Sequence, residues 1–187
     1  QELECNFNMS GDTLIHGKDL VRVEQEELFE PEYKTGFDRN LWIWKTAEEN
    51  KKYFMVADVA RGDGKDNSTF YIFESDTMEM CCEYQGKLPL DSFARLIYDT
   101  SKSYGMCLTV VENNSVGMTV LTKLKDDGHP NIYHSRKSTH EYVEASYTEQ
   151  TSIIAGFSTT VKTRPMIIAK LEEFIRNKVL KIRSRRL

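Results

Sequence analysis

The sequence predicts an α/β fold, a mixed central sheet with helices on both of its faces. Three strand patterns follow one another between residues 53 and 84, and helix and strand patterns then alternate toward residue 187. Consecutive strands with short links are typical of an antiparallel meander, whereas alternating helices and strands are typical of parallel pairing. The 187 residues, 40% of them hydrophobic, are enough for a core that needs no disulfide or structural metal.

The predicted strands are apolar runs rich in β-branched and aromatic residues, and turn signals separate them. The strongest run covers residues 53–60 and ends in the turn Arg61-Gly62-Asp63-Gly64. The other predicted strands cover residues 69–74, 80–84 and 107–112, with shorter candidates at 132–134 and 179–182.

Three helices are predicted from apolar residues spaced three and four apart. The clearest is capped by Asp91, runs through Phe93 and Ile97, and stops at Gly105. A second passes through residues 120–124 and ends at Gly128. The third begins at Thr163-Arg164-Pro165, where proline is tolerated in the first turn.

Residues 1–50 have a mixed pattern and are interpreted as a lead-in segment, and residues 51–187 are interpreted as the main domain. Within the first segment, Leu41-Trp42-Ile43-Trp44 fits either a short strand or an aromatic clamp for nucleic-acid bases. Ordinary packing is the more common explanation of such a tryptophan pair.

Charge and apolar run lengths limit the class of partner. The formal net charge of -4 argues against a general polyanion binder, although residues 170–187 hold seven basic and two acidic residues. No apolar run approaches the roughly 18 residues of a membrane span, so we expect a soluble protein with no membrane partner. The four cysteines show no C-x-x-C spacing, and we expect reduced thiols, with Cys81 and Cys82 on opposite faces of a strand.

Two acids occur where strong strands end. Asp58 lies in the most apolar strand, and Glu112 follows the run 108–111. A carboxylate at the end of a buried strand needs a partner, and two of them on neighbouring strands would form a cation site. Oxygen ligands without nearby histidine or thiolate favour Mg²⁺ or Mn²⁺ over zinc. Capping of the following turns, or pairing with Arg61 or a lysine, explains the same residues.

Other groups give weaker signals. Asp66 lies eight residues after Asp58 and can act as a third ligand or as a solvated turn residue. Arg136 and Lys137 suit phosphate contacts, as does the basic C-terminal segment, but solvated surfaces are an equal explanation.

Common catalytic and nucleotide-binding motifs are absent. The run Gly62-Asp63-Gly64-Lys65 lacks both the earlier glycine and the following Ser or Thr of a Walker loop, and Asn67 replaces the last glycine of a dinucleotide fingerprint. The four histidines show no ligand spacing, and no serine or cysteine nucleophile motif is present.

Taken together, four stretches of the sequence resemble the nuclease domain of the large terminase subunit, the DNA-packaging motor of tailed bacteriophages, especially of the myovirus type. They occur in the order of that family and span nearly the whole chain. The stretches are residues 1–5 with Leu14-Ile15, residues 53–68, residues 111–117, and residues 156–160 continuing to Thr163-Arg164-Pro165.

The resemblance implies a ribonuclease H-like fold and a metal-dependent endonuclease that cuts concatemeric viral double-stranded DNA. Asp58 matches the acid of the first strand, Glu112 the acid after the fourth strand, and Asp66 an acid of the following hairpin. Arg136, Lys137 and Arg164 are then expected to contact DNA. Two divalent ions about 4 Å apart would activate water, position the phosphodiester and stabilise the leaving 3′-oxygen.

The resemblance also implies partners and one departure from the family. Implied partners are double-stranded DNA, the portal ring, the small terminase subunit and an ATPase domain of the same full-length chain, at the procapsid portal in the host cytoplasm. The third catalytic acid of the family would follow the strand expected at 179–182, and no later acid matches it. We therefore expect a nuclease domain truncated before its third acid, weakly active or inactive.

Three alternatives remain open at this point. A resolvase or integrase of the same fold would share the acids but not the flanking stretches. An actin-like ATPase also places a phosphate hairpin after a first-strand aspartate, but it requires two such subdomains. A non-catalytic module that docks DNA or the portal would use the basic residues and leave Asp58 and Glu112 structural.

Overall fold

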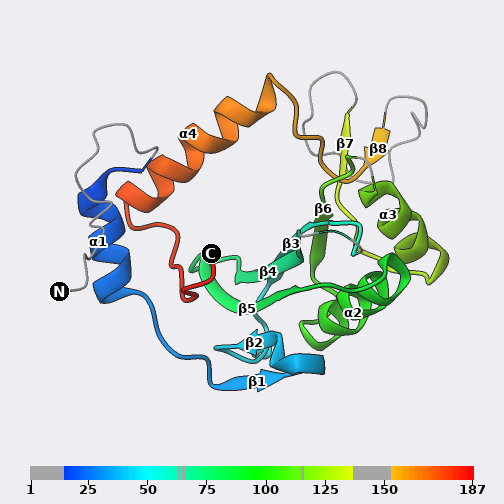
Figure 1. The fold of residues 1–187 in the computed structure, drawn as a ribbon, viewed down its shortest axis with the longest axis horizontal. Helices are drawn as coiled ribbons and strands as arrows, with labels where there is room; N and C mark the ends of the chain where they lie inside the picture. Colours follow the sequence, from blue (N-terminus) through cyan, green and yellow to red (C-terminus); the bar gives the residue numbers. More distant parts are fainter. Residues whose placement is uncertain (1–14, 63, 65, 115, 137–152) are drawn as a thin grey trace.

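The fold is a mixed six-stranded sheet covered by helices on both faces, as predicted (Figure 1). A computed structural model describes residues 15–62, 64, 66–114, 116–136 and 153–187. The strand order is β1-β2-β5-β4-β3-β6, and β7 pairs with β8 in a separate small sheet. The strands are β1 (Tyr33–Thr35), β2 (Leu41–Ile43), β3 (Tyr53–Asp58), β4 (Ser68–Glu74), β5 (Glu79–Gly86), β6 (Leu108–Val111), β7 (His134–Arg136) and β8 (Ile153–Ala155).

The predicted meander forms the centre of the sheet. β3 pairs antiparallel with β4, and β4 pairs antiparallel with β5. β6 then returns parallel to β3 after a helical crossover, as alternating elements require. β1 and β2, from the segment before residue 50, extend the sheet beyond β5.

Alternate residues of the strands face two different cores. Met55, Ala57 and Ile72 belong to a fully buried core beneath α2 and α3, whereas Phe54 and Val56 face a smaller cluster beneath α1 and α4. This period of two is what a sheet buried on both faces requires. The helices are α1 (Gly17–Glu26), α2 (Leu90–Ser103), α3 (Gly117–Asp126) and α4 (Thr163–Arg176).

A bulge in β5 corrects the expected placement of the two adjacent cysteines. Ile72 pairs with Cys82 and Phe73 pairs with Met80, so Cys81 is the extra residue. Both Cys81 and Cys82 are therefore buried in the same core, as free thiols, instead of pointing to opposite faces.

Several local boundaries differ from the sequence prediction. Asp91 lies in the first turn of α2, whose preceding residue is Pro89, and no side chain caps that helix. Residues 179–182 form one bridge, Lys181 with Glu79, instead of a strand. Ile132 likewise bridges Thr109 before β7 begins. Among the described residues, no helix is long and apolar enough to cross a membrane.

Candidate functional site

The parallel pair β3 and β6 brings the two predicted acids to one edge of the sheet. Ala57 pairs with Val111, and the next residues along the two strands are Asp58 and Glu112. The Glu112 amide donates to the Ala57 carbonyl oxygen at 2.9 Å. Because both strands run in the same direction, the two acids emerge side by side.

The carboxyl groups of Asp58 and Glu112 line one cavity of about 370 Å³, together with Thr69, Tyr71 and Thr159. Asp58 is exposed to solvent as a residue, but its carboxyl group is partly buried. This burial is the largest cause of the raised pKa of Asp58. Hydrogen bonding to Glu112 and the charge of Glu112 raise that pKa further. Two adjacent carboxylates that resist simultaneous ionisation are stabilised by a shared proton or by a cation.

Asn114 fixes the position of Glu112, a role that the sequence analysis did not assign. Its side-chain Nδ2 donates to Glu112 Oε1 at 2.9 Å and to the Thr159 carbonyl oxygen at 3.0 Å. The carboxylate is thereby joined to the segment that precedes α4. A lone asparagine after a strand carries no periodic signal, so only the fold reveals this contact.

The neighbouring Asn113 joins the same two segments below the cavity. Its Nδ2 donates to the Ala155 carbonyl oxygen at 2.8 Å, and Ser158 Oγ donates to Asn113 Oδ1 at 2.7 Å. Gly117 closes the turn after Glu112, because a Cβ at that position would overlap the Glu112 carbonyl oxygen. The strand end carrying Glu112 is therefore held on both sides.

The remaining predicted site residues lie around these two acids. Asp66 is exposed in the hairpin before β4, does not line the cavity, and contributes a smaller electrostatic increase to the pKa of Asp58. Arg136 ends β7, and Arg164 lies in the first turn of α4; both are exposed and outside the cavity lining. Lys137 and the segment 1–5 lie outside the described residues.

The tryptophan pair and much of the basic C-terminal segment have structural roles. Trp42 and Trp44 contact each other edge to face at 6.0 Å between ring centroids, and the Arg186 guanidinium lies 3.7 Å from the Trp42 ring centroid. Arg186 also pairs with the buried Glu83, and Arg183 pairs with Glu79. These contacts favour packing over base stacking for Trp42.

The donor set fits a hard divalent cation held by two acids. Over the described part of the chain, no group of three or more histidine, cysteine, aspartate and glutamate side chains is placed to hold a metal. Asp58 and Glu112 supply carboxylate oxygens and no nitrogen or sulfur, which is the ligand chemistry of Mg²⁺ or Mn²⁺.

Comparison with known proteins identifies the fold. No protein-family model matches the sequence, and no curated protein matches it. The large terminase nuclease of thermophilic phage G20c with bound magnesium has a TM-score of 0.63 at 13% identity, over 90% of this chain and 75% of that one. The chain has the fold of a large terminase nuclease.

Two further structures of the G20c nuclease support this assignment. The form with bound zinc gives a TM-score of 0.59 at 13% identity, over 87% of this chain and 79% of that one. The form with bound cobalt gives 0.58 at 15% identity, over 82% and 68%. The predicted ribonuclease H-like fold is confirmed as this large terminase nuclease fold.

Proposed function

We propose that this chain is the nuclease domain of a phage large terminase subunit and cuts concatemeric viral double-stranded DNA during packaging. One observation carries the proposal: at the edge of a terminase nuclease fold, Asp58 and Glu112 lie in one cavity, where partial burial and then the neighbouring Glu112 raise the pKa of Asp58. Ion pairing with a basic side chain would lower that pKa, so the geometry favours a cation site over mere structural acids.

Mg²⁺ or Mn²⁺ is the proposed cofactor, with two ions in the complete site. The similar G20c nuclease has been described with magnesium, cobalt and zinc. Asp58 and Glu112 would hold the ions. Asp66 would act either as a further ligand or as a residue that supports the ligands without binding an ion itself. Bound divalent ions lower the pKa of a coordinated water and neutralise charge on the phosphodiester.

The protein side chains orient these groups. Asn114 holds Glu112 Oε1 and so fixes the carboxyl group beside Asp58. Arg164, in the first turn of α4, and Arg136, at the end of β7, flank the segment 156–160 that carries Thr159. We propose that they and Lys137 contact backbone phosphates of the DNA, which adds affinity without sequence preference.

The proposed partners follow from the same assignment. They are an ATPase domain of the same protein, the portal ring and the small terminase subunit, at the procapsid. The ATPase domain would precede a lead-in within residues 1–50. A resolvase-type or integrase-type nuclease remains the alternative enzyme, and a non-catalytic DNA or portal docking module remains the alternative non-enzyme.

Manganese titration and plasmid cleavage test the proposal. We expect Asp58→Asn to weaken Mn²⁺ binding, which electron paramagnetic resonance measures. We also expect it to reduce plasmid cleavage at least a hundredfold, because a cation ligand is lost. Asp76→Asn is the matched control, since Asp76 lies in the exposed turn between β4 and β5, at the opposite end of the sheet.

The outcome separates the candidate functions. Metal-dependent cleavage that disappears in Asp58→Asn and survives in Asp76→Asn supports the nuclease. Cleavage that survives Asp58→Asn overturns the assignment of the acids. DNA binding that is lost on charge reversal at Arg136 and Lys137, in a protein that neither binds Mn²⁺ nor cuts, favours the docking module.

A further inference from the structure

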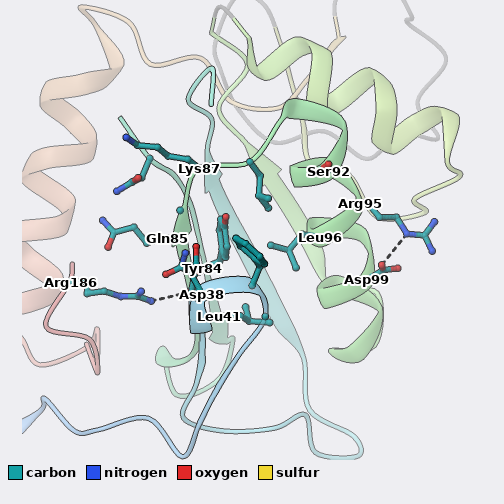
Figure 2. Close-up of a pocket in the computed structure, with 16 residues that line it drawn as sticks. Asp38, Leu41, Tyr84, Gln85, Lys87, Ser92, Arg95, Leu96, Asp99 and Arg186 are labelled. Atoms are coloured by element: carbon teal, nitrogen blue, oxygen red, sulfur yellow. Dashed lines mark hydrogen bonds and ion pairs between the residues drawn. The ribbon is translucent and has the colours of Figure 1, made fainter. Parts of the chain in front are cut away.

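A second cavity lies at the same edge of the sheet as the acids, beyond β4 (Figure 2). It has a volume of about 760 Å³ and is bounded by the 3₁₀ turn Phe37–Arg39, the end of β5 and the first half of α2. Figure 2 shows Tyr84 between Gln85 and Lys87 on the strand side and Leu96 on the helix side. None of these residues takes part in the site around Asp58 and Glu112.

Tyr84 presents a polar group to this cavity that the described residues leave without a partner. The residue is 5% exposed and lines the cavity, yet no hydrogen bond to its hydroxyl is formed within the described part of the chain. Burial and the nearby charge of Asp38 raise its pKa, so the hydroxyl stays protonated and can donate. The hydroxyl oxygen is not one of the fully buried side-chain atoms that lack a partner among the described residues, so it opens to the cavity and is available to a ligand.

The absence of a side chain at Gly86 keeps the floor of the cavity open. A Cβ there would come within 2.5 Å of the Tyr84 hydroxyl oxygen and 3.0 Å of Asn40 Nδ2. Asn67 and Gln85 add two more side-chain amides to the lining. Amides and a hydroxyl around an open floor are the donors and acceptors that recognise the edge of a nucleic-acid base.

An exposed aromatic ring stands at the mouth of the cavity. Phe37 lines it and is 85% exposed, in a turn where both Asp38 and Arg39 have φ of 55°. Left-handed backbone at two consecutive residues other than glycine is unfavourable. An exposed phenylalanine ring also adds no hydrophobic stabilisation to the folded protein. A base stacked on Phe37 would bury that ring.

The charges around the cavity fit one phosphate and not a polyphosphate. Arg95 is paired with Asp99 at 3.0 Å, and Arg186 is paired with Glu83 at 3.3 Å. Of the described residues in the lining, Lys87 is the remaining cation without an ion pair, and Asp38 faces the same space. A nucleoside triphosphate would require more positive charge than one lysine provides.

The cavity lies at the same end of the sheet as the acids, but on the opposite face. Thr69 pairs with Asp58, and Asn67, two residues earlier, lines the second cavity. Val56 and Tyr71 line the cavity of the acids from the face that α1 and α4 cover, whereas Tyr84 and Leu96 line the second cavity from the face that α2 covers. The start of β4 therefore borders both cavities, through Asn67 and Thr69, from one end of the sheet.

We propose that this cavity receives an unpaired nucleotide of the DNA substrate, from a frayed or extruded position. Phe37 stacks on the base, Tyr84 and the amides contact its edge, and Lys87 contacts one phosphate. The inference rests on the proposed nuclease function for the identity of the strand. It adds a substrate contact separate from the cation site.

Fluorescence anisotropy with a labelled single-stranded 12-mer, in EDTA so that no cleavage occurs, tests the inference. Phe37→Ala is expected to weaken binding about tenfold through lost stacking, and Tyr84→Phe about threefold or more. Both variants keep the fold, because Phe37 is exposed and phenylalanine preserves the tyrosine ring packing; circular dichroism checks this. Phe29→Ala and Lys102→Ala, an exposed aromatic and a lysine in the last turn of α2, are expected to change affinity less than twofold.

Two results overturn the inference. Equal affinities for wild type, Phe37→Ala and Tyr84→Phe would exclude a nucleotide from the cavity. If AMP displaces the labelled 12-mer at the same concentration as unlabelled 12-mer does, the DNA strand is excluded as the source of the bound nucleotide.

Plasmid cleavage by the same variants separates the two proposals. Cleavage that depends on Asp58 but not on Phe37 removes only this inference. Oligonucleotide binding that depends on Phe37, in a protein that does not cut, removes only the nuclease.

Discussion

The two faces of the sheet differ in how tightly their helices are packed. On one face, α2 and α3 contribute fully buried side chains such as Phe93, Ile97 and Leu124. On the other face, the only buried apolar residues of the helices are Val23 of α1 and Ile175 of α4. An apolar cavity of about 840 Å³ lies between those two helices and the sheet.

The loosely packed face is also the face that carries the acids. Val56, Tyr71 and Ile167 line both the large apolar cavity and the cavity of Asp58 and Glu112. The face of α2 and α3 therefore acts as a rigid scaffold, whereas the opposite face leaves space beside the proposed cation site. Functional sites are commonly placed on the less stable part of a scaffold, where segments can move to admit a substrate.

Matched core truncations give the largest expected difference between the two faces. Leu124→Ala should lower the free energy of unfolding by about 3–5 kcal/mol, because the closely packed face cannot collapse around the new cavity. Ile175→Ala should lower it by about 2 kcal/mol, because Ile175 already borders empty space. Urea denaturation followed by circular dichroism measures both values, and equal losses would contradict the comparison.

Hydrogen exchange should show the same difference without a substitution. Amides of α4 are expected to exchange through openings about 2 kcal/mol less costly than those of α2, because α4 buries little apolar surface. Both helices have 14 residues, so helix length is matched. Equal protection in native-state exchange would show that α4 is as firmly held as α2.

Strand and helix positions were predicted well where packing follows a simple period. The alternation in residues 53–58 and the helical spacing of residues 90–103 both reflect burial of one face, which the sequence records directly. α1 was missed because its polar sequence buries only Val23. The bulge at Cys81 was missed because one extra residue in a strand leaves the hydrophobic pattern almost unchanged.

The sequence also indicated which acids would meet, but not how they are held. Asp58 and Glu112 are recognisable because polar residues at the ends of buried strands stand out. Asn114, which donates to Glu112, also donates to the carbonyl oxygen of Thr159, 45 residues later in the chain. Long-range contacts of this kind have no local pattern, and the cavity around Tyr84 was missed for the same reason.

Acid pH should destabilise the tightly packed face of α2 and α3, by less than the core truncations do. Burial lowers the pKa of His129, whose Nε2 lies 2.9 Å from Ser101 Oγ. A histidine with a lowered pKa in the folded state contributes stability above its unfolded pKa of about 6.5, and that stability is lost as pH falls. The free energy of unfolding should therefore fall as the pH is lowered from 7 to 5.5.

Substitution identifies the source of this acid sensitivity. In His129→Gln the urea midpoint should depend less on pH than in the wild type. Part of the dependence should remain, because burial also lowers the pKa of His134. A pH dependence identical to that of the wild type would show that His129 is not buried in its neutral form.

Asn114→Ala should have the smallest effect on stability and a clear effect on cleavage. Asn114 is exposed, so loss of its two hydrogen bonds should change the free energy of unfolding by less than about 1 kcal/mol. Glu112 would lose the donor that fixes Oε1, and misplacement of this proposed cation ligand should lower the rate of the chemical step by about tenfold. Asn131→Ala is the control, because Asn131 is also exposed and donates to one carbonyl, that of Met106, away from the acids. Measurement of kcat and KM on plasmid DNA distinguishes the two outcomes: a lower kcat at unchanged KM supports positioning of Glu112, whereas equal activity of both variants would mean that the loosely packed face holds Glu112 without Asn114.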